Sequence, residues 1–312
     1  HLLYSRFFMR ALAFNNKNFN YIEPFTSLFT QGMVCHETYK NKNNQWLYPE
    51  EIEKNSDGSF QTKEKHEKVI NGPSESMSKS KKNTIDPENM IKLFGADAVR
   101  FFMLSDSPPE KDIQWSNEGI SASYKFLQKI WNLIDKIFIK KDNEEVNKLH
   151  DEELDKFTNR IIHNATKNLE NFNYNVVIAN IHETYNFFYQ FLENKKASQS
   201  CLKKNIKKII ILLMPIIPHL SNECYEKLYE KQFELEVGWP EIKKNLLLEK
   251  SCNIVIQVNG KKRGILELPV NSDEIEIANQ AKNIINVKKN IENKNIQKQI
   301  YIKNRLLNFI TK

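Results

Sequence analysis

The residues best suited to chemistry in this chain form the short segment Met77-Ser78-Lys79-Ser80. The Lys79 ammonium is a compact charge on a long stem, which suits it to follow moving phosphate oxygens. Serine hydroxyls and backbone N–H groups in such a loop can donate further hydrogen bonds to an anion. The same four residues would also fit a solvated Lys/Ser linker, so the surrounding sequence has to distinguish the two interpretations.

The residues that follow the segment predict a rigid support for a loop. Asp86 is a good N-cap, Pro87 suits the first helical position, and Gly95 is placed to end that helix. A second helical stretch is predicted over residues 97–104, and Pro108-Pro109 closes the unit. We therefore expect the loop to be anchored directly to a capped helix.

From Met77 to Trp115 the sequence resembles the KMSKS region of class I aminoacyl-tRNA synthetases. The further matching strings are Lys81-Lys82-Asn83, Ile85-Asp86-Pro87, Gly95-Ala96-Asp97-Ala98-Val99-Arg100 and Asp112-Ile113-Gln114-Trp115. The resemblance implies that Met77, Ser78, Lys79 and Ser80 bind ATP, which is accompanied by Mg²⁺. It also implies that Lys79 is catalytic and stabilises the charge that grows on the phosphates as pyrophosphate leaves.

One position departs from the KMSKS signature. Ser76 stands where the family has its first lysine, which puts any contribution from that position in doubt. Lys81 or Lys82 is an alternative source of the missing charge.

Several features narrow the resemblance to leucyl-tRNA synthetases of the bacterial type. Residues 23–34 resemble the strand that leads into the leucine-specific insertion, which would then be residues 35–72. Residues 257–264 look like part of the C-terminal domain of those enzymes. The segment His1-Leu2-Leu3-Tyr4-Ser5-Arg6-Phe7 matches a family string whose histidine borders the leucine pocket, so His1 would line that pocket; the alternative is a histidine on an exposed helix face.

The expected fold class is α/β plus α plus α+β. Residues 1–115 would be the C-terminal half of a Rossmann-type catalytic domain, with a helix over 1–14 and irregular, polar structure over 25–72. Residues 116–240 predict four amphipathic helices, a bundle of the anticodon-binding type. Residues 250–312 predict a small α+β domain with strands at 254–258, 263–268 and 299–302 and a helix at 273–290.

Two elements of the helical region also resemble the anticodon-binding bundle of class I synthetases. They are Met214-Pro215-Ile216-Ile217-Pro218-His219 and Trp239-Pro240, which would close the bundle. His219 either contacts tRNA or caps and packs, and packing is the preferred interpretation.

The net charge of +7 lies entirely in the last part of the chain. Residues 250–312 contain 12 Lys and Arg against 5 Asp and Glu, whereas residues 1–249 contain 34 of each sign. A compact basic region predicts a polyanion partner, and the alternative is a solubilising surface in a lysine-rich protein. The resemblance implies that the partner is tRNA(Leu), with contacts from Lys261, Lys262, Arg263 and Arg305.

Other classes of site and location are disfavoured by the sequence. The four cysteines are scattered without a CxxC pair, which predicts neither a disulfide framework nor a zinc site, and we expect no bound metal in the chain itself. The longest apolar run, Ile209–Ile217, is too short to span a membrane. We expect a cytoplasmic monomer.

The predicted function is that of a leucine–tRNA ligase, which activates leucine with ATP and transfers it to tRNA(Leu). We expect this chain to be the C-terminal part of such an enzyme, inactive alone because the first half of the active site and the editing domain are not in it. The alternatives are a valyl, isoleucyl or methionyl enzyme, or a non-catalytic tRNA-binding module.

Overall fold

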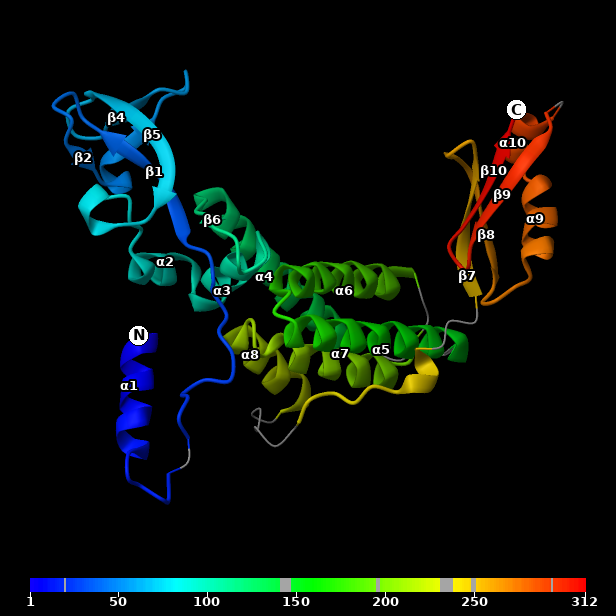
Figure 1. Ribbon diagram of the computed structural model, residues 1–312, viewed down its shortest axis with the longest axis horizontal. Helices are drawn as coiled ribbons and strands as arrows, with labels where there is room; N and C mark the ends of the chain where they lie inside the picture. Colours follow the sequence, from blue (N-terminus) through cyan, green and yellow to red (C-terminus); the bar gives the residue numbers. More distant parts are fainter. Residues whose placement is uncertain (20, 141–146, 195–196, 231–237, 248–250, 293) are drawn as a thin grey trace. The chain divides into compact units, whose positions relative to one another are not determined.

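The structure is a computed structural model that describes residues 1–19, 21–140, 147–194, 197–230, 238–247, 251–292 and 294–312 (Figure 1). The chain divides into two compact units. The first comprises residues 1–154 and 161–240, and the second comprises residues 155–160 and 241–312. The regions expected to form the first two domains thus fall within one compact unit, except for residues 155–160. No helix in the described parts of the chain is long and apolar enough to cross a membrane.

The predicted N-terminal helix is confirmed as α1, which spans Leu2–Ala13. None of its residues is buried, and its apolar side chains are exposed. The helix is tied to the segment that follows it, because Arg6 and Arg10 both pair with the Glu23 carboxylate. The hydrogen bond from Arg6 is the main cause that lowers the pKa of Glu23 below its usual range.

Residues 34–76 form a sheet, so the expectation of irregular structure over 25–72 was wrong. The strands are β1 (Val34–Lys40), β2 (Trp46–Leu47), β3 (Ile52–Lys54), β4 (Phe60–Thr62) and β5 (Lys68–Ser76), with a 3₁₀ turn η1 (Pro49–Glu51). Their order is β2-β1-β5-β4-β3, and all these neighbours are antiparallel. The turn Ser56-Asp57-Gly58 closes the β3–β4 hairpin, where Asn55 N–H donates to the Ser59 carbonyl.

This sheet escaped sequence-based prediction because its core is small. Only Tyr39, Ile52 and Val69 form its buried apolar cluster, with Leu47 and Phe60 packed against them. Most of its strand positions are therefore polar and lack the apolar alternation that marks a half-buried strand. Burial, together with the Glu37 carboxylate that accepts its hydroxyl hydrogen bond, raises the pKa of Tyr39.

The expected Rossmann-type parallel sheet is not seen in the described part of residues 1–115. One short strand, β6 (Ile113–Gln114), runs parallel to β1, and the other pairs of this sheet are antiparallel. A Rossmann sheet requires several successive strand–helix–strand units, and these residues contain a single helical connection, between β5 and β6. The coarser expectation, a mixed α/β architecture with a helical region and two sheets, is confirmed.

The two helices predicted after the loop are confirmed as α2 (Pro87–Phe94) and α3 (Ala96–Ser105). The Asp86 carboxylate accepts a hydrogen bond of 2.9 Å from Glu88 N–H, as an N-cap should. Gly95 separates the helices with a φ of +81°, a conformation that costs glycine little. The buried side chains of Phe102, Trp115 and Ile120 form an apolar cluster beneath both helices.

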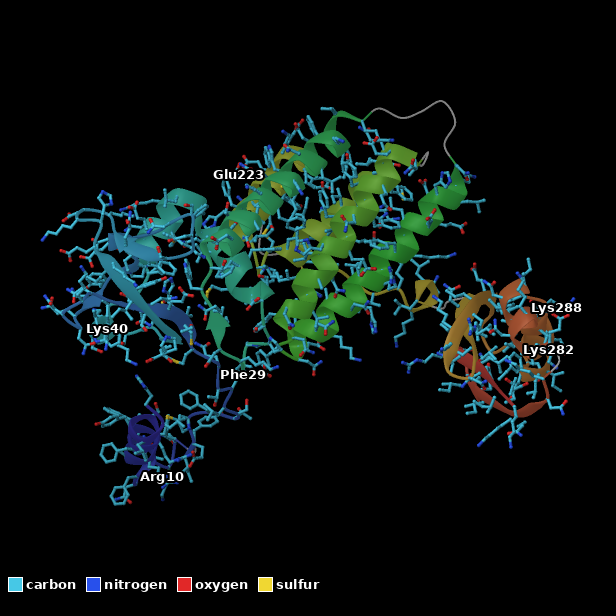
Figure 2. All side chains as sticks on the ribbon, turned by 90° about the horizontal axis from the view of Figure 1, so that it is seen from above. Arg10, Phe29, Lys40, Glu223, Lys282 and Lys288 are labelled. Carbon is cyan, nitrogen blue, oxygen red and sulfur yellow. The ribbon has the colours of Figure 1, made fainter. Side chains whose placement is uncertain are left out.

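Residues 117–229 form a helical bundle, in which the helices run alongside one another (Figure 1, Figure 2). The helices are α4 (Asn117–Ile139), α5 (Lys148–Glu170), α6 (Tyr174–Asn194), α7 (Gln199–Leu213) and α8 (Pro218–Tyr229). Four helices were expected, and the described residues of this range form five. Pro218 occupies the first position of α8 rather than ending the preceding helix, because proline needs no helical N–H partner there.

The second unit contains a four-stranded sheet with two helices. The elements are the 3₁₀ turn η4 (Lys244–Leu246), β7 (Ser251–Val258), β8 (Lys261–Pro269), α9 (Glu274–Lys282), α10 (Ile285–Ile291), β9 (Ile296–Ile302) and β10 (Leu306–Thr311). The sheet order is β8-β7-β10-β9, with β10 parallel to β7. The buried side chains of Ile254, Ile256 and Phe309 belong to the core between sheet and helices.

Three of these four strands were expected, and β10 was missed. Its sequence, Leu306-Leu307-Asn308-Phe309-Ile310, does not alternate strictly between apolar and polar residues. Asn308 is buried because its side-chain oxygen accepts a hydrogen bond of 3.2 Å from Gly260 N–H at the hairpin turn. A polar residue that holds a turn is thus built into the middle of a core strand.

Candidate functional site

The loop that follows β5 has a defined local structure. Ser78 is the N-cap of a 3₁₀ turn, η2 (Lys79–Lys81), and its hydroxyl accepts a hydrogen bond of 3.4 Å from Lys81 N–H. Lys82 then ends the turn in the left-handed conformation, with a φ of +53°. The Ser78 and Ser80 hydroxyl oxygens lie 3.3 Å apart. The predicted loop is therefore a tight turn that projects the Lys79 side chain.

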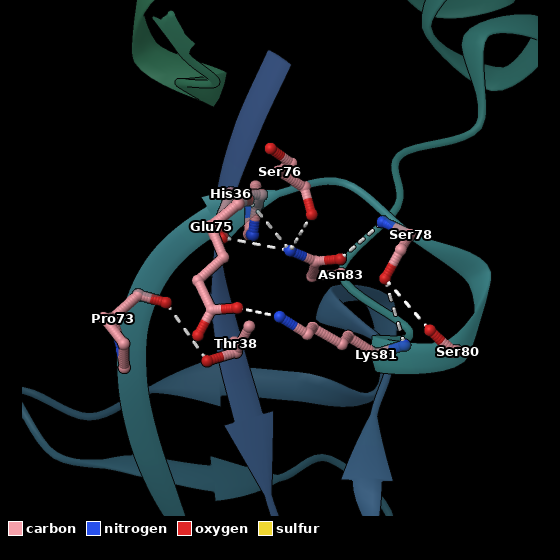
Figure 3. A network of polar contacts seen from close by, with 9 residues as sticks. All are labelled: His36, Thr38, Pro73, Glu75, Ser76, Ser78, Ser80, Lys81 and Asn83. Atoms are coloured by element: carbon pink, nitrogen blue, oxygen red, sulfur yellow. Dashed lines mark hydrogen bonds and ion pairs between the residues drawn. The ribbon is translucent and has the colours of Figure 1, made fainter. Parts of the chain in front are cut away.

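A fully buried asparagine fixes this turn to the sheet (Figure 3). The Asn83 amide nitrogen lies 3.2 Å from the carbonyl of His36, 3.1 Å from that of Glu75 and 3.4 Å from that of Ser76. Its amide oxygen accepts a hydrogen bond of 2.8 Å from Ser78 N–H. One side chain thus joins β1, the end of β5 and the start of the turn. Asn83 belongs to the matching string Lys81-Lys82-Asn83, but its residue type alone did not predict this role.

The three lysines of the loop have different surroundings. Lys81 forms an ion pair with the Glu75 carboxylate (Figure 3), and the Lys82 ammonium lies 4.9 Å from the centre of the Tyr48 ring. Lys79 is exposed, and no side-chain hydrogen bond or ion pair involves it within the described residues. Lys81 and Lys82, the alternative sources of the charge missing at position 76, thus each have a partner within the protein.

The predicted ATP-binding residues divide into two groups. Lys79 and Ser80 are exposed, whereas Ser78 is half-buried and engaged in the turn. The Met77 side chain packs against the apolar cluster beneath α2 and α3, and its N–H donates to the Val34 carbonyl at 2.9 Å. Met77 thus anchors the loop, while Lys79 is the side chain offered to a ligand.

The histidines singled out from the sequence have separate environments. His1 is exposed at the start of α1, and the structure shows no pocket partner for it within the described residues. His219 lies at the start of α8, where its Nδ1 is 2.9 Å from the carboxylate of Asp97 on α3. That contact favours a capping role for His219. Trp239, expected to close the bundle, donates a hydrogen bond of 2.8 Å to the Thr166 hydroxyl of α5.

In the second unit the structure separates the predicted RNA contacts. Lys261 and Lys262 are exposed directly after the Asn259-Gly260 turn, as expected for a hairpin tip. Arg263 is half-buried, and its Nε is covered by protein without a hydrogen-bond partner. Arg305 lies toward the other end of the sheet, because the next residue, Leu306, pairs with Val255 in parallel β7.

The structure instead brings other lysines to the end of the sheet that carries the hairpin tip. Lys312 follows Thr311, whose N–H and carbonyl both bond to the Asn259 side chain. Lys298 pairs with Ile310 on the neighbouring strand. We call Lys261, Lys262, Lys298 and Lys312, all of them exposed, the basic tip. Strand register, which sequence patterns did not reveal, is what assembles it.

Within the described residues, no group of three or more neighbouring His, Cys, Asp or Glu side chains could hold a metal ion. Two family models match the chain. One, described as the anticodon-binding domain of tRNA ligase, matches residues 151–298, and the other, described as tRNA synthetases class I (I, L, M and V), matches residues 56–116.

Curated relatives match almost the whole chain. The leucine–tRNA ligase of Orientia tsutsugamushi (strain Boryong) is 39% identical, with 99% of this chain and 36% of the relative covered. That of Rickettsia bellii (strain RML369-C) is also 39% identical, with 99% and 37% covered. The chain thus spans about a third of the length of these relatives.

A solved structure agrees with this relationship at the level of the fold. A crystal structure of a LeuRS–tRNA–LeuAMS ternary complex from Agrobacterium radiobacter K84 is 24% identical, with a TM-score of 0.69. The match covers 100% of this chain and 36% of that one. The second family model includes the lysine loop of residues 76–83, and the chain is similar to class I aminoacyl-tRNA synthetases, in particular to leucine–tRNA ligases.

Proposed function

We propose that the protein containing this chain is a leucine–tRNA ligase, which joins leucine to AMP and then transfers it to tRNA(Leu). The observation that carries the proposal is the sorting of the loop lysines. Glu75 and Tyr48 contact two of them, whereas Lys79 extends from the turn with no side-chain partner among the residues that the structure describes. A cation held ready but unpaired is what a reaction with a developing negative charge requires.

The chemistry follows from the charges involved. Attack of the leucine carboxylate on the α-phosphate of ATP forms leucyl-adenylate and releases pyrophosphate, so negative charge accumulates on the departing phosphates. Lys79 binds that charge as it grows, which lowers the barrier more than uniform binding would. Ser80 is exposed beside it and can donate its hydroxyl to the same phosphates.

The residues of the loop fit a nucleotide triphosphate but not a metal held by protein alone. The Glu75 carboxylate is paired with Lys81, and the described residues contain no cluster of metal-ligating side chains. Mg²⁺ commonly binds through substrate phosphates with few protein ligands. In our proposal Mg²⁺ therefore arrives with ATP, and this chain contributes the lysine rather than the metal ligands.

The remaining parts of the chain would serve the RNA. We propose residues 1–115 as part of the catalytic domain with an insertion at 35–72, residues 116–240 as the anticodon-binding-type bundle, and residues 250–312 as a tRNA-binding domain. The bundle would support tRNA(Leu), and the basic tip would contact its phosphates without reading bases. His1 would border the leucine pocket, and the protein would act as a cytoplasmic monomer.

The proposal is tested by amino-acid-dependent exchange of pyrophosphate into ATP, measured on the full-length protein. We expect leucine to support exchange at least about 100-fold better than methionine, by analogy with the discrimination known for hydrophobic pockets. Preferential exchange with valine, isoleucine or methionine would reassign the substrate. Absence of exchange with every amino acid, together with tight tRNA binding, would identify a non-catalytic RNA-binding module instead.

A second measurement addresses the chain itself. We propose that the 312 residues alone neither activate leucine nor edit mischarged tRNA, since they span about a third of the length of the relatives. Leucine-dependent exchange by the isolated chain, after removal of any contaminating host synthetase, would contradict this statement.

A further inference from the structure

Two charged residues of α3 form hydrogen bonds with the turn between α7 and α8 and with the start of α8. Asp97 and Arg100 are three positions apart, so they lie on the same face of the helix. Asp97 is buried, with 7% of its surface exposed. Their contacts all lead away from α3, to the bundle.

Asp97 caps a helix that does not belong to its own segment. Helix α8 has no side-chain cap of its own, because its N-cap residue is Ile217. The Asp97 carboxylate accepts hydrogen bonds of 2.7 Å from Leu220 N–H and 2.9 Å from Nδ1 of His219. An anion at a helix N-terminus satisfies unpaired N–H groups and complements the positive end of the helix dipole.

Arg100 binds the turn just before that helix. Its Nε donates to the Ile216 carbonyl at 2.9 Å, and its Nη2 donates to the Pro215 carbonyl at 2.6 Å. The planar guanidinium thus bridges two successive carbonyls, a geometry that a lysine cannot reproduce. The four contacts around one turn fix both the position and the orientation of α3 on that turn.

The same helix is continuous with the lysine loop. The apolar cluster beneath α3 contains buried Phe102, and Met77 of the loop packs against that cluster. Met90 and Phe94 of α2 pack there as well, so the loop, α2 and α3 share one apolar core. A displacement of α3 would therefore displace the anchor of Lys79.

We propose that Asp97 and Arg100 are positioning residues for leucine activation. They hold α3, and with it the lysine loop, against the turn between α7 and α8. This contact sets where the Lys79 ammonium meets the nucleotide. The bundle would then have a second task beside RNA binding, as the fixed base of a catalytic loop. This inference rests on the function proposed above. Misplacement of a catalytic group by about 1 Å is known to cost on the order of 100-fold in rate.

The test is a double-mutant cycle in the full-length enzyme, with leucine-dependent exchange expressed per titrated active site. Arg100→Ala should lower kcat of exchange about 10- to 100-fold. In the Lys79→Ala background, the same substitution should lower it by less than about threefold, because there is no longer an ammonium to misplace. Arg100→Lys should restore part of the rate, since it can reach one carbonyl but not bridge two.

Two further variants guard against a trivial loss of folding. Asp97→Asn preserves shape and should reduce kcat with a thermal unfolding midpoint close to that of the wild type. Lys92→Ala removes an exposed charge of α2 that has no partner within the described residues, and it should leave exchange within about twofold.

Each result has a distinct meaning. Multiplicative losses in the Lys79→Ala, Arg100→Ala double variant would overturn the positioning role and leave the proposed function standing. Full activity of Arg100→Ala and Asp97→Asn would do the same. Full activity of Lys79→Ala would overturn both the loop's role and the positioning role.

Discussion

The lysine loop and the basic tip both expose lysines, and we propose that each meets an anionic ligand, but the two regions hold their lysines differently. In the loop, two of three lysines have specific partners and a buried asparagine fixes the turn, whereas Lys79 has no side-chain partner in the described part of the chain. In the basic tip, four exposed lysines, two on β8, one on β9 and one directly after β10, lie at one end of a sheet. The loop therefore places one charge at a defined position, whereas the basic tip gathers several charges at one end of a sheet.

This contrast predicts how each region responds to substitution. A reaction that depends on one placed charge should fail when that charge is lost, and neighbouring changes should act through it. Binding that depends on several exposed charges to phosphates should weaken in small, similar steps and respond to salt.

The largest effect is expected for Lys79→Ala in the full-length enzyme. Removal of the ammonium should lower kcat of leucine-dependent exchange about 100- to 1000-fold, by analogy with loss of one donor to a developing oxyanion. The far-ultraviolet spectrum and the thermal unfolding midpoint should be unchanged, because the side chain is exposed and has no partner in the described structure. Exchange within threefold of the wild type would remove Lys79 from the mechanism.

A smaller loss is expected for Asn83→Ala. The substitution removes the hydrogen bonds that join β1, β5 and Ser78 N–H, and it leaves buried carbonyl groups without partners. We expect kcat of exchange to fall about 10- to 100-fold and the free energy of unfolding to fall by about 1–3 kcal/mol.

The matched control is Asn89→Ala, because Asn89 is exposed on α2 and has no side-chain partner in the described structure. It should change the free energy of unfolding by less than about 0.5 kcal/mol. Equal effects of the two substitutions would mean that the hydrogen bonds of the Asn83 side chain do not hold the loop.

A graded effect is expected in the basic tip. The double substitution Lys261→Ala, Lys262→Ala should weaken tRNA binding by roughly three- to tenfold per lysine near 0.1 M salt. The slope of the logarithm of affinity against the logarithm of salt should become shallower by about 1 per lysine removed. Filter binding or fluorescence titration at several salt concentrations measures both quantities. An unchanged salt slope would place the RNA elsewhere.

The smallest effect on catalysis is expected for the partnered lysines. Lys81→Met loses an ion pair with partly exposed Glu75, and exposed pairs contribute on the order of 0–1 kcal/mol. Lys82→Met loses a contact with the Tyr48 ring of similar size. Both should keep kcat of exchange within about fivefold of the wild type. A loss as large as that of Lys79→Ala would show that the loop uses several charges at once.

The sequence predicted the elements that depend on residues close together in the chain. Asp86, Pro87 and Gly95 announced α2, and the Asn259-Gly260 turn announced the β7–β8 hairpin, because capping and turn chemistry act within a few residues. That Lys79 binds the phosphates of ATP stays a prediction from its motif and the residues around it. The small sheet of residues 34–76 was missed because few of its residues are buried, and β10 was missed because Asn308 interrupts its apolar pattern.

What the sequence could not predict is which residues meet across long separations. The contact of Arg100 with Pro215 and Ile216 joins residues more than a hundred positions apart. The hydrogen bonds of Asn83 and the assembly of Lys298 with Lys261 depend on strand register. Residue type and spacing do not predict such pairings. The partners of Lys81 and Lys82 likewise became evident only in the folded chain.

The most direct test of this division of labour measures two quantities on two variants of the full-length enzyme. The quantities are kcat of leucine-dependent exchange and the dissociation constant of tRNA(Leu), and the variants are Lys79→Ala and Lys261→Ala, Lys262→Ala. We predict that the first variant loses exchange and keeps tRNA affinity within about twofold, while the second keeps exchange and loses affinity. Either variant changing both quantities by tenfold or more would contradict the account.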